Sequence, residues 1–290
     1  QGMVDMAPLG LEHRAQRRCG TGTGLAVALG SLLLQVPQGF FHCLSGLSQH
    51  LRIRLGPGWA WGLIGDDGLG LRMGLSVGAQ LRGMDQTFVT APIYPPASMV
   101  MGVIVNKNGD RFVTEDSYHS RTSAFVMDQP DSAAFLVINE SHMSQQKNYL
   151  VPLIDGWETV EEMEEGLGIP EGRLRATIDR YNEHAAAGED PDFHKAPEYL
   201  APLTQGPWAA YNLSLGKAIY AGFTMGGMVT SVDGQVRRAD GSVIDGLYAA
   251  GACASNIAEN GKNYASGTQL GEGSFFGRRA GRHAAAAAAN

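Results

Sequence analysis

The hydrophobic positions in the first half of the chain predict one short helix followed by strands. Behind the turn sequence Gly65-Asp-Asp-Gly68, apolar residues have the spacing of an amphipathic helix that begins at an Asp-Gly cap; these residues are Leu71, Leu75, Val77 and Leu81. The runs Gly102–Asn106 and Arg111–Val113 flank Asn108-Gly109, which predicts a β-hairpin because Asn-Gly supplies the positive φ angles of a tight turn. The apolar run Phe135–Ile138 predicts another short strand.

Two helices are predicted between Trp157 and Gly188. Thr159 and Glu162 have the spacing of a capping box at the start of the first helix. The second helix carries one apolar face, formed by Leu174, Ile178 and Tyr181, and Gly188 is expected to end it. We interpret the acidic run from Glu158 to Glu165 as a solvated helix face and not as a metal site. His184 and His194 lack metal-ligand spacing and are interpreted as surface or packing residues.

The C-terminal stretch alternates short strands with glycine turns and then forms a helix. Asp233-Gly234 and Asp240-Gly241 separate the strands, and Val243–Gly251 is an apolar strand that runs into small residues. The segment from Tyr264 to Gly271 leads into a helical pattern with Phe275, Phe276, Arg279 and Ala280. A helix start lined by glycine brings backbone N–H groups and the positive end of the helix dipole toward a ligand. The pattern therefore predicts a site for an anionic or electron-accepting ligand.

The composition indicates a folded chain and argues against several partners. Charged residues make up 18% and hydrophobic residues 44%, which is typical of globular proteins. The formal net charge of -7 leaves no broad positive field for nucleic acid, so we expect none as a partner. Glycine accounts for 39 of 290 residues, well above the usual ~7%, and such an excess often accompanies backbone close to a ligand.

The cysteine pattern and the length of the apolar runs indicate in which cellular compartment the protein resides. Cys19, Cys43 and Cys253 are odd in number and lack metal-ligand spacing, which fits a reducing environment. No uncharged apolar run approaches the ~20 residues that cross a bilayer. We therefore expect a cytoplasmic location without a stable membrane span.

Residues 1 to 62 lack a clear strand or helix pattern, and we expect them to be irregular or non-native. Gly22 and Gly24 match the first two glycines of a dinucleotide-binding fingerprint, but Val27 stands where the third belongs. The preceding segment, from Glu12 to Arg18, is charged where a buried strand is required. The run is therefore not interpreted as a dinucleotide-binding turn.

Several ordered motifs resemble the flavoproteins of the fumarate reductase and 3-ketosteroid dehydrogenase family. They are Gly65-Asp-Asp-Gly-Leu-Gly70, Asn106-x-x-Gly-x-Arg-Phe-Val-x-Glu-Asp116, Thr224-Met-Gly-Gly227, Gly246-Leu-Tyr-Ala-Ala-Gly251, and Ser266 to Gly271 with Phe276-Gly-Arg-Arg-Ala-Gly281. The likeness extends from Gly65 to His283. Because several motifs occur in the same order, the resemblance is specific, unlike a single glycine pattern.

The resemblance implies an α/β (α+β) fold in which a partial Rossmann-like FAD-binding domain is interrupted by an α+β substrate domain. Residues 63–90 and 216–290 would form the FAD-binding domain, and residues 91–215 the substrate domain. The implied FAD contacts are Asp67, Gly68, Thr224, Gly226, Gly227, Gly251, Ala252, Gly267, Gln269 and Leu270. The family's N-terminal βαβ unit with its GxGxxG is missing, and we expect an N-terminally truncated product. Ala252 also replaces an acid that the family commonly has after Ala-Ala-Gly.

The same resemblance indicates the substrate class. Fumarate reductases carry a His before Thr-x-Gly-Gly, an Arg before the Leu-Gly of the last helix, and an acid-catalyst Arg after Arg-Phe-Val-x-Glu. Those places hold Phe223, Gln269 and the Tyr118-His119 pair here, so a dicarboxylate would lose its cationic partners. We therefore expect a small hydrophobic substrate, a steroid. The 1-dehydrogenases have a Gly four positions after the C-terminal Tyr, where this chain has Thr268, and the Δ4-(5α) type is favoured.

The resemblance also implies roles for three catalytic residues. Desaturation beside a ketone needs a donor for the enolate oxygen, a base for the α proton and a hydride acceptor at the β carbon. Tyr264 would polarise the C3 ketone, Ser266 would receive the C4 proton, and Tyr118 would relay that proton toward solvent. His119 is a structural or solvated residue, with a proton-relay role as the alternative.

Two alternatives to a 3-ketosteroid dehydrogenase stay open. The first is a fumarate reductase-like flavoprotein that acts on another neutral enone. The second is an inactive truncated fragment of such an enzyme, which the missing fingerprint favours. The Tyr264-Ala-Ser266 sequence favours the dehydrogenase.

Overall fold

The computed structural model describes residues 59–60, 68–90, 97–143 and 151–289. Helices and strands are mixed along the chain, as the predicted fold class requires. The detailed Rossmann-like arrangement and the domain boundaries stay predictions. Trp59–Ala60 forms the short strand β1 inside the segment expected to be irregular; the remainder of residues 1–62 lies outside the described residues.

A four-stranded antiparallel sheet forms the frame of one part of the molecule. Its strands, in spatial order, are β4 (Val103–Asn106), β5 (Ala134–Asn139), β7 (Trp208–Asn212) and β6 (Leu153–Trp157). All side chains of β4 and β5 are buried, because apolar residues cover both faces of these strands. The predicted strand at Phe135–Ile138 is confirmed as the centre of β5.

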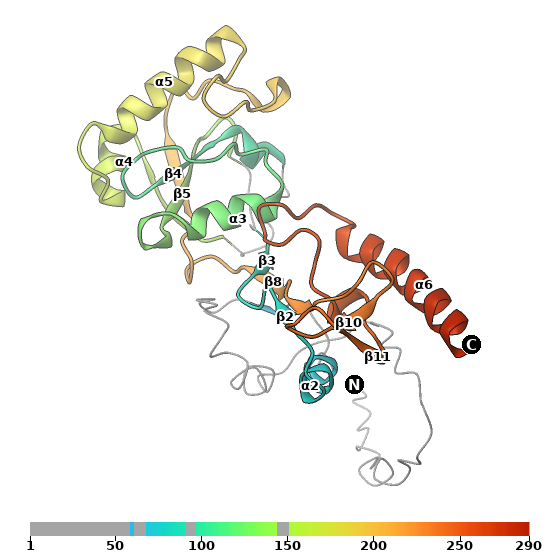
Figure 1. Cartoon of the computed structure of the whole chain (residues 1–290). Helices are drawn as coiled ribbons and strands as arrows, with labels where there is room; N and C mark the ends of the chain where they lie inside the picture. The colour runs from blue at the N-terminus through green and yellow to red at the C-terminus, as the bar shows by residue number, and fades with distance from the viewer. Residues whose placement is uncertain (1–58, 61–67, 91–96, 144–150, 290) are drawn as a thin grey trace, which may run out of the picture.

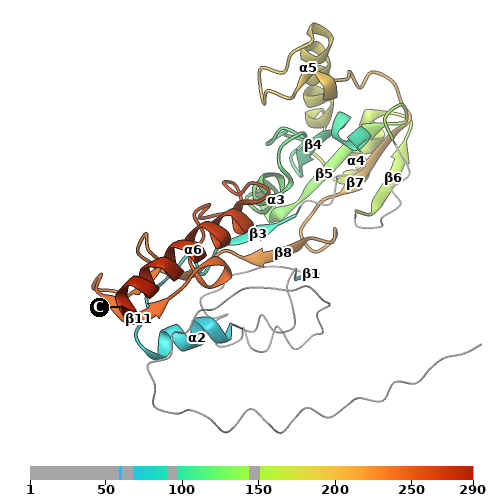
Figure 2. The same cartoon turned by 90° about the vertical axis from the view of Figure 1, so that its right-hand side faces the viewer.

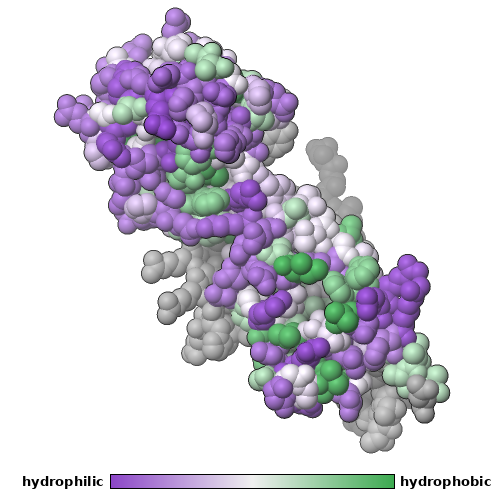
Figure 3. All heavy atoms as spheres, turned by 45° about the horizontal axis from the view of Figure 1, so that its top comes forward, coloured by the Kyte–Doolittle hydropathy of each residue, from purple (hydrophilic) through white to green (hydrophobic). Residues whose placement is uncertain are grey.

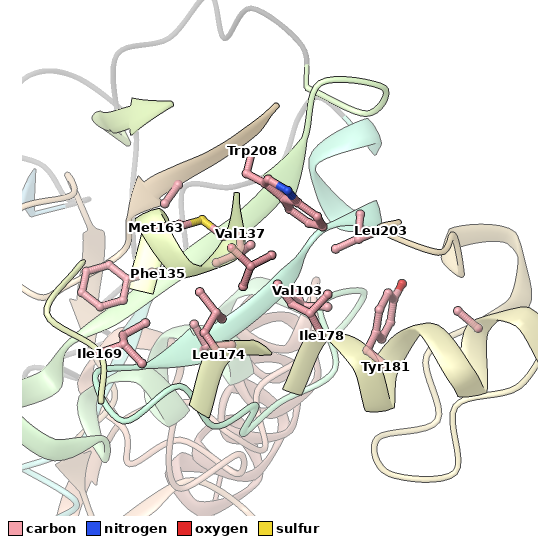
Figure 4. Packing of buried hydrophobic residues seen from close by; sticks show 14 residues of the cluster. Val103, Phe135, Val137, Met163, Ile169, Leu174, Ile178, Tyr181, Leu203 and Trp208 are labelled. Atoms are coloured by element: carbon pink, nitrogen blue, oxygen red, sulfur yellow. The ribbon is translucent and has the colours of Figure 1, made fainter. Parts of the chain in front are cut away.

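Helices α4 (Val160–Leu167) and α5 (Arg173–Ala187) cover one face of this sheet (Figure 4). The predicted capping box is confirmed, since the Glu162 amide donates to Thr159 Oγ1 at 3.2 Å and the Glu162 carboxylate accepts from the Thr159 amide. Gly188 ends α5 with a φ of 82°. The predicted apolar face of α5 packs toward Trp208 of β7, through Leu174, Ile178 and Tyr181 (Figure 4).

The predicted hairpin is only half correct. Gly109 has the expected positive φ of 83°, but Arg111–Val113 is not a strand, and Arg111 forms only an isolated bridge with Val105. The physical reason is that the Arg111 side chain is buried among carboxylates, which fixes this segment to the interior of the fold. Strand β4 therefore pairs with β5 and not with a strand formed by residues 111–113.

The acidic run is not uniformly a solvated face, which corrects the interpretation of Glu158 to Glu165. Glu164 is only 3% exposed. Its carboxylate accepts hydrogen bonds from the first amides of α5, at 2.9 Å from Gly172, 2.6 Å from Leu174 and 3.0 Å from Arg175. These amides lack intrahelical carbonyl partners, so Glu164 caps a neighbouring helix.

The other part of the molecule contains short strands and helices. Helix α2 (Leu69–Ser76) forms where predicted but is shorter, because Leu81 belongs to β2 (Leu81–Arg82). Strand β2 pairs with β9 (Gly227–Met228). Gly68 is the N-cap of α2, in the left-handed conformation and without a side-chain cap, while Asp67 lies outside the described residues.

The remaining strands form two small sheets. Strand β8 (Ala221–Thr224) lies between β1 and β3 (Thr87–Val89). The short strands predicted around the Asp-Gly turns are confirmed as β10 (Gln235–Arg237) and β11 (Val243–Tyr248), which form an antiparallel pair with Gly234 and Gly241 at positive φ. Within the described ranges, short 3-10 helices lie in connecting segments at Ala97–Met101, Pro130–Ser132, Pro197–Tyr199 and Gly251–Cys253 (η4).

Two further helices frame the junction between these parts. Helix α3 (His119–Met127) follows the β4 region, and the C-terminal α6 (Thr268–Ala288) extends along the second part. Figures 1 and 2 show β3 and β8 between the four-stranded sheet and the part that contains α2, β10, β11 and α6. None of the described helices combines the length and the apolar composition of a membrane span.

Candidate active site

An aromatic cluster lies where the two parts meet, and it contains two of the three predicted catalytic residues. Phe88 stacks on Phe223 with ring centroids 4.6 Å apart and an interplanar angle of 14°. The ring of Tyr264 meets Phe88 at 4.6 Å, and that of Tyr118 at 6.4 Å. The structure therefore brings Tyr118 and Tyr264 together from distant parts of the sequence.

Strand pairing and side-chain hydrogen bonds hold this cluster together. Phe88 and Phe223 are directly opposite in the antiparallel pair of β3 and β8. Tyr118 is the N-cap residue of α3. The first turns of α3 form hydrogen bonds to β3 and to the segment that precedes Tyr264. Ser123 Oγ donates to the Val89 carbonyl, and Ser120 Oγ donates to the Gly261 carbonyl at 2.8 Å.

The hydroxyl of Tyr264 is coupled to the start of α6. Tyr264 is 8% exposed, and its Oη accepts a hydrogen bond from the Gln269 amide at 3.3 Å. The Gln269 side chain accepts from Nδ2 of the buried Asn256. A hydroxyl that accepts one hydrogen bond is polarised and becomes a better donor in another, so Tyr264 is suited to donate to a ketone. Gln269, predicted as a cofactor contact, thus also contacts a predicted catalytic residue.

The other residues predicted at the start of α6 are exposed. Ser266 lies on the short segment between Tyr264 and α6, and Gly267 is the N-cap of α6 with a φ of 87°. A Cβ added at Gly267 would find no atom within 4 Å. Leu270 is 79% exposed, and Ile257, whose amide donates to Glu272 of α6, is 62% exposed.

These features fit the flavin end of FAD. The start of α6 carries the positive end of the helix dipole, while its Thr268 and Gln269 amides donate to the Ala265 carbonyl and the Tyr264 hydroxyl. Exposed apolar side chains beside them offer a surface for a flat, weakly polar ring system. The space open at Gly267 would be lost to any larger residue. The residues that would hold this group are Gly267, Gln269 and Leu270.

The predicted cofactor glycines of the Thr-x-Gly-Gly sequence have a different structural reason to be glycine. A Cβ built at Gly226 would lie 2.5 Å from the Gly83 carbonyl oxygen, and one at Gly227 would lie 2.3 Å from the Ala254 carbonyl carbon. Both glycines are buried and allow backbone segments to approach each other closely. A contact of either glycine with FAD stays a prediction.

The remaining predicted cofactor residues lie around this region. Gly251 begins η4 at a φ of 63° and faces α6, since a Cβ built there would lie 3.6 Å from the Gly273 Cα. Ala252 is exposed, as is Thr224 at the end of β8. Gly68 lies at the start of α2, and a Cβ on its helical neighbour Gly70 would contact Cys253 of η4. The cofactor assignments of these residues stay predictions.

His119 completes the aromatic cluster. Its ring lies edge-on to Phe88 at 5.8 Å and to Tyr118 at 4.3 Å. Burial lowers the pKa of His119 below its usual value of 6.5. The neutral imidazole is therefore the prevalent form at neutral pH, which is compatible with proton acceptance.

A buried ion network explains the Arg-Phe-Val-x-Glu motif structurally. The Arg111 guanidinium donates to both oxygens of Glu115 and to both oxygens of Asp190, at distances between 2.8 and 3.2 Å. Lys195 Nζ lies 3.3 Å from Glu115 and donates to the Gly102 carbonyl at 2.7 Å. The network fixes the segment that leads into Tyr118, and nothing in the motif's spacing indicated Asp190 or Lys195.

His184, Asp190 and Asp192 form one possible ligand group for a metal, with ligand atoms within 4.8 Å of one another. Both carboxylates already have cationic partners, since Asp190 binds Arg111 and Asp192 binds Arg180. A cation would have to compete with these arginines, so the packing interpretation of His184 is retained.

Known proteins match most of this chain. A family model described as an FAD binding domain matches residues 33–270. The solved structure of 3-ketosteroid-delta4-(5alpha)-dehydrogenase from Rhodococcus jostii RHA1, in complex with 4-androstene-3,17-dione, matches with a TM-score of 0.71 and 38% identity. That match covers 84% of this chain and 50% of the Rhodococcus chain.

Two proteins of known function are similar in sequence. Urocanate reductase from Eggerthella lenta is 28% identical over 269 residues, which are 84% of this chain and 43% of that protein. The 4-oxocyclohexanecarboxylate 2-dehydrogenase from Sinomonas cyclohexanicum is 31% identical over 233 residues, covering 64% of this chain and 40% of that protein. The chain thus spans half or less of the length of these relatives.

The family model covers most of the chain, and the open, glycine-bounded start of α6 fits the cofactor that the model describes. The chain therefore belongs to the FAD binding domain family of fumarate reductase-like and ketosteroid dehydrogenase-like flavoproteins, and its cofactor is FAD.

Proposed function

We propose that this chain is the catalytic part of an FAD-dependent dehydrogenase that introduces the C4–C5 double bond into a saturated 3-ketosteroid. The observation that carries the proposal is the aromatic cluster in which Tyr118 and Tyr264 meet around Phe88. The likeness to the Rhodococcus dehydrogenase supports this substrate class over a dicarboxylate.

The cluster suits a neutral alicyclic ketone. Phe223, which stands where fumarate reductases carry a His, stacks on Phe88 and meets Tyr264 at 5.6 Å. This wall of the site is apolar and would leave a carboxylate without a charge-assisted partner. Transfer of an apolar steroid ring system from water to such a surface is favourable.

In the proposed reaction, Tyr264 donates a hydrogen bond to the C3 ketone, and its own oxygen is polarised by the Gln269 amide. Ser266 receives the proton as the C4–H bond breaks, and Tyr118 passes a proton onward to solvent. Bound FAD would supply the oxidant of the reaction, that is, the acceptor for the hydride that leaves C5. The electron pair of the C4–H bond becomes the new C4–C5 double bond, so atoms and charges balance.

The decisive experiment mixes the purified, FAD-loaded chain anaerobically with a saturated 5α-3-ketosteroid and records the flavin absorbance. Bleaching of the oxidised flavin band supports the proposal. Tyr264→Phe should slow bleaching by about 100-fold or more, since it removes one oxyanion donor. Tyr211→Phe, which removes a buried hydroxyl in the four-stranded sheet, is the matched control and should bleach at the parental rate.

Two other results would contradict the proposal and favour one of the alternative functions. Urocanate reductase and other sequence relatives are reductases, which favours the alternative of enone reduction. If chemically reduced flavin in the chain is reoxidised by a neutral enone while the saturated ketone causes no bleaching, the chain is a reductase. If no flavin is retained, this polypeptide is an inactive fragment.

A further inference from the structure

Phe88 is the central residue of the aromatic cluster, although nothing in its sequence context marked it. It is 3% exposed, which leaves it too buried to form the wall of a substrate site itself. It nevertheless contacts the rings of Tyr118, His119, Phe223 and Tyr264. Phe88 can therefore influence chemistry only through the residues that surround it.

The contact pattern makes Phe88 the link between the two tyrosines. Among the ring contacts within the described part of the chain, none joins Tyr118 directly to Tyr264, whereas Phe88 meets both. The Tyr264 ring is edge-on to Phe88 at an interplanar angle of 63°, and the Tyr118 ring is tilted by 49°. Such edge and tilted contacts have preferred geometries, so moving one ring changes the best position of the other.

The backbone under Phe88 is fixed to both tyrosine-bearing segments. On one side, Ser123 of α3 donates to the carbonyl of Val89. On the other, the segment before Tyr264 lies so close that a Cβ added to Gly261 would be 2.9 Å from the Thr87 carbonyl oxygen. Ser120 closes the arrangement by donating to the Gly261 carbonyl at 2.8 Å. The Phe88 ring thus projects from a rigid position between two anchored segments.

We infer that Phe88 is a positioning residue that holds the Tyr118 and Tyr264 hydroxyls in one relative arrangement for catalysis. The inference rests on the proposed function for the roles of the two hydroxyls. Leucine at this position would keep most of the apolar volume but remove the flat ring against which both tyrosines pack. Both phenol rings would then populate more than one orientation, and the hydroxyls would be misplaced relative to a bound ketone.

The first test compares Phe88→Leu with Phe135→Leu, which removes a buried ring from the four-stranded sheet instead. In the FAD-loaded chain, Phe88→Leu should lower kcat by about 10- to 100-fold with KM changed less than about 3-fold, because misplaced catalytic groups cost rate more than binding. The absorption band of bound 4-androstene-3,17-dione should shift to longer wavelength in the parent, from the hydrogen bond to its ketone. Phe88→Leu should lose that shift, and Phe135→Leu should keep it.

The second test needs neither turnover nor steroid. The chain is labelled with 3-fluorotyrosine, and the Tyr118 and Tyr264 signals in the fluorine NMR spectrum are assigned with Tyr118→Phe and Tyr264→Phe. Phe88→Leu should broaden or split both signals, whereas Phe135→Leu should leave both single and sharp. A changed ring current alone would move the signals without broadening or splitting them.

The outcomes distinguish the positioning role of Phe88 from the proposed steroid dehydrogenase function. Two sharp tyrosine signals in Phe88→Leu, together with a retained band shift, would overturn the positioning role. If the parent neither binds nor oxidises a steroid but Phe88→Leu still splits both signals, the positioning role stands and the steroid proposal fails. Split signals together with the lost band shift support both.

Discussion

At the scale of single residues, Glu164 stabilises the fold by capping a helix to which it does not belong. Its carboxylate accepts three amide hydrogen bonds at the start of α5 and is almost fully buried. Glu164→Ala should lower the free energy of unfolding by about 1–3 kcal/mol, because buried amides lose their acceptor. Urea unfolding measures the effect, and the exposed neighbour Glu165→Ala is the matched control, expected within about 0.5 kcal/mol of the parent. Equal effects for both variants would contradict the capping role.

Asp190 makes the free energy of unfolding depend on pH. Burial alone would raise its pKa, but hydrogen bonds and attraction from Arg111 outweigh burial, and the pKa of Asp190 lies below its usual value of 3.8. The folded state therefore binds this proton less readily than the unfolded state, so the stabilisation is present above that value and is lost as the pH falls through the folded pKa.

The matched variant Asp190→Asn isolates this contribution. At pH 7 it should lose about 3–5 kcal/mol of unfolding free energy, since Arg111 and Glu115 remain buried without their full set of partners. Urea unfolding at a series of pH values should also show a shallower fall for the variant than for the parent as the pH drops below about 4, toward the folded pKa of Asp190. Parallel curves would show that Asp190 does not carry the acid sensitivity.

At the scale of elements, close backbone contact decides where glycine is required. Gly227 of β9 faces the Ala254 backbone at a distance that excludes a Cβ, whereas a Cβ at Gly281 in α6 would find no atom within 4 Å. Gly227→Ala should therefore destabilise by about 3 kcal/mol or more through backbone displacement. Gly281→Ala should stabilise by about 0.5–1 kcal/mol, because alanine favours a helix interior. Thermal unfolding of both variants checks the pair, and a stable Gly227→Ala would contradict the packing of β9 against residue 254.

Whether a feature could be predicted depended on how far apart in the sequence the residues that determine it lie. The capping box at Thr159 and the end of α5 at Gly188 depend on residues within one or two turns, so the sequence predicted both correctly. The hairpin failed at Arg111, whose partner Asp190 is 79 positions away. The solvated interpretation failed at Glu164 for the same reason, since its partners lie on the next helix.

At the scale of the whole molecule, the sequence indicated two members of the aromatic cluster but not the residues that pack around them. Family motifs pointed to Tyr118 and Tyr264, and the structure brings these two into one cluster. Phe88 was not found, because its position becomes meaningful only through the pairing of β3 with β8. Asn256 was missed likewise, since only the fold brings it to Gln269. Family motifs therefore indicated the residues proposed for chemistry, whereas the packing around them depends on contacts between segments far apart in the sequence.

Binding of FAD should stabilise the molecule as a whole. Any ligand that binds only the folded state raises the melting temperature, and FAD at 100 times its Kd would add about 2.7 kcal/mol. Differential scanning fluorimetry with FAD, and with riboflavin as the comparison, measures the effect. A shift with both ligands would assign the contact to the flavin ring, as the start of α6 predicts. A melting temperature unchanged at every FAD concentration would contradict cofactor binding by this chain.

The hydrogen bond from Ser120 to the Gly261 carbonyl joins residues 141 positions apart, and the cluster around Phe88 depends on the same closure. During synthesis the chain emerges from its N-terminus, so Phe88 and Tyr118 leave the ribosome long before Tyr264 exists to cover them. Until the C-terminal segment arrives, an apolar patch at the junction stays bare. The nascent protein is therefore prone to aggregate or to need a chaperone in the interval before α6 is made.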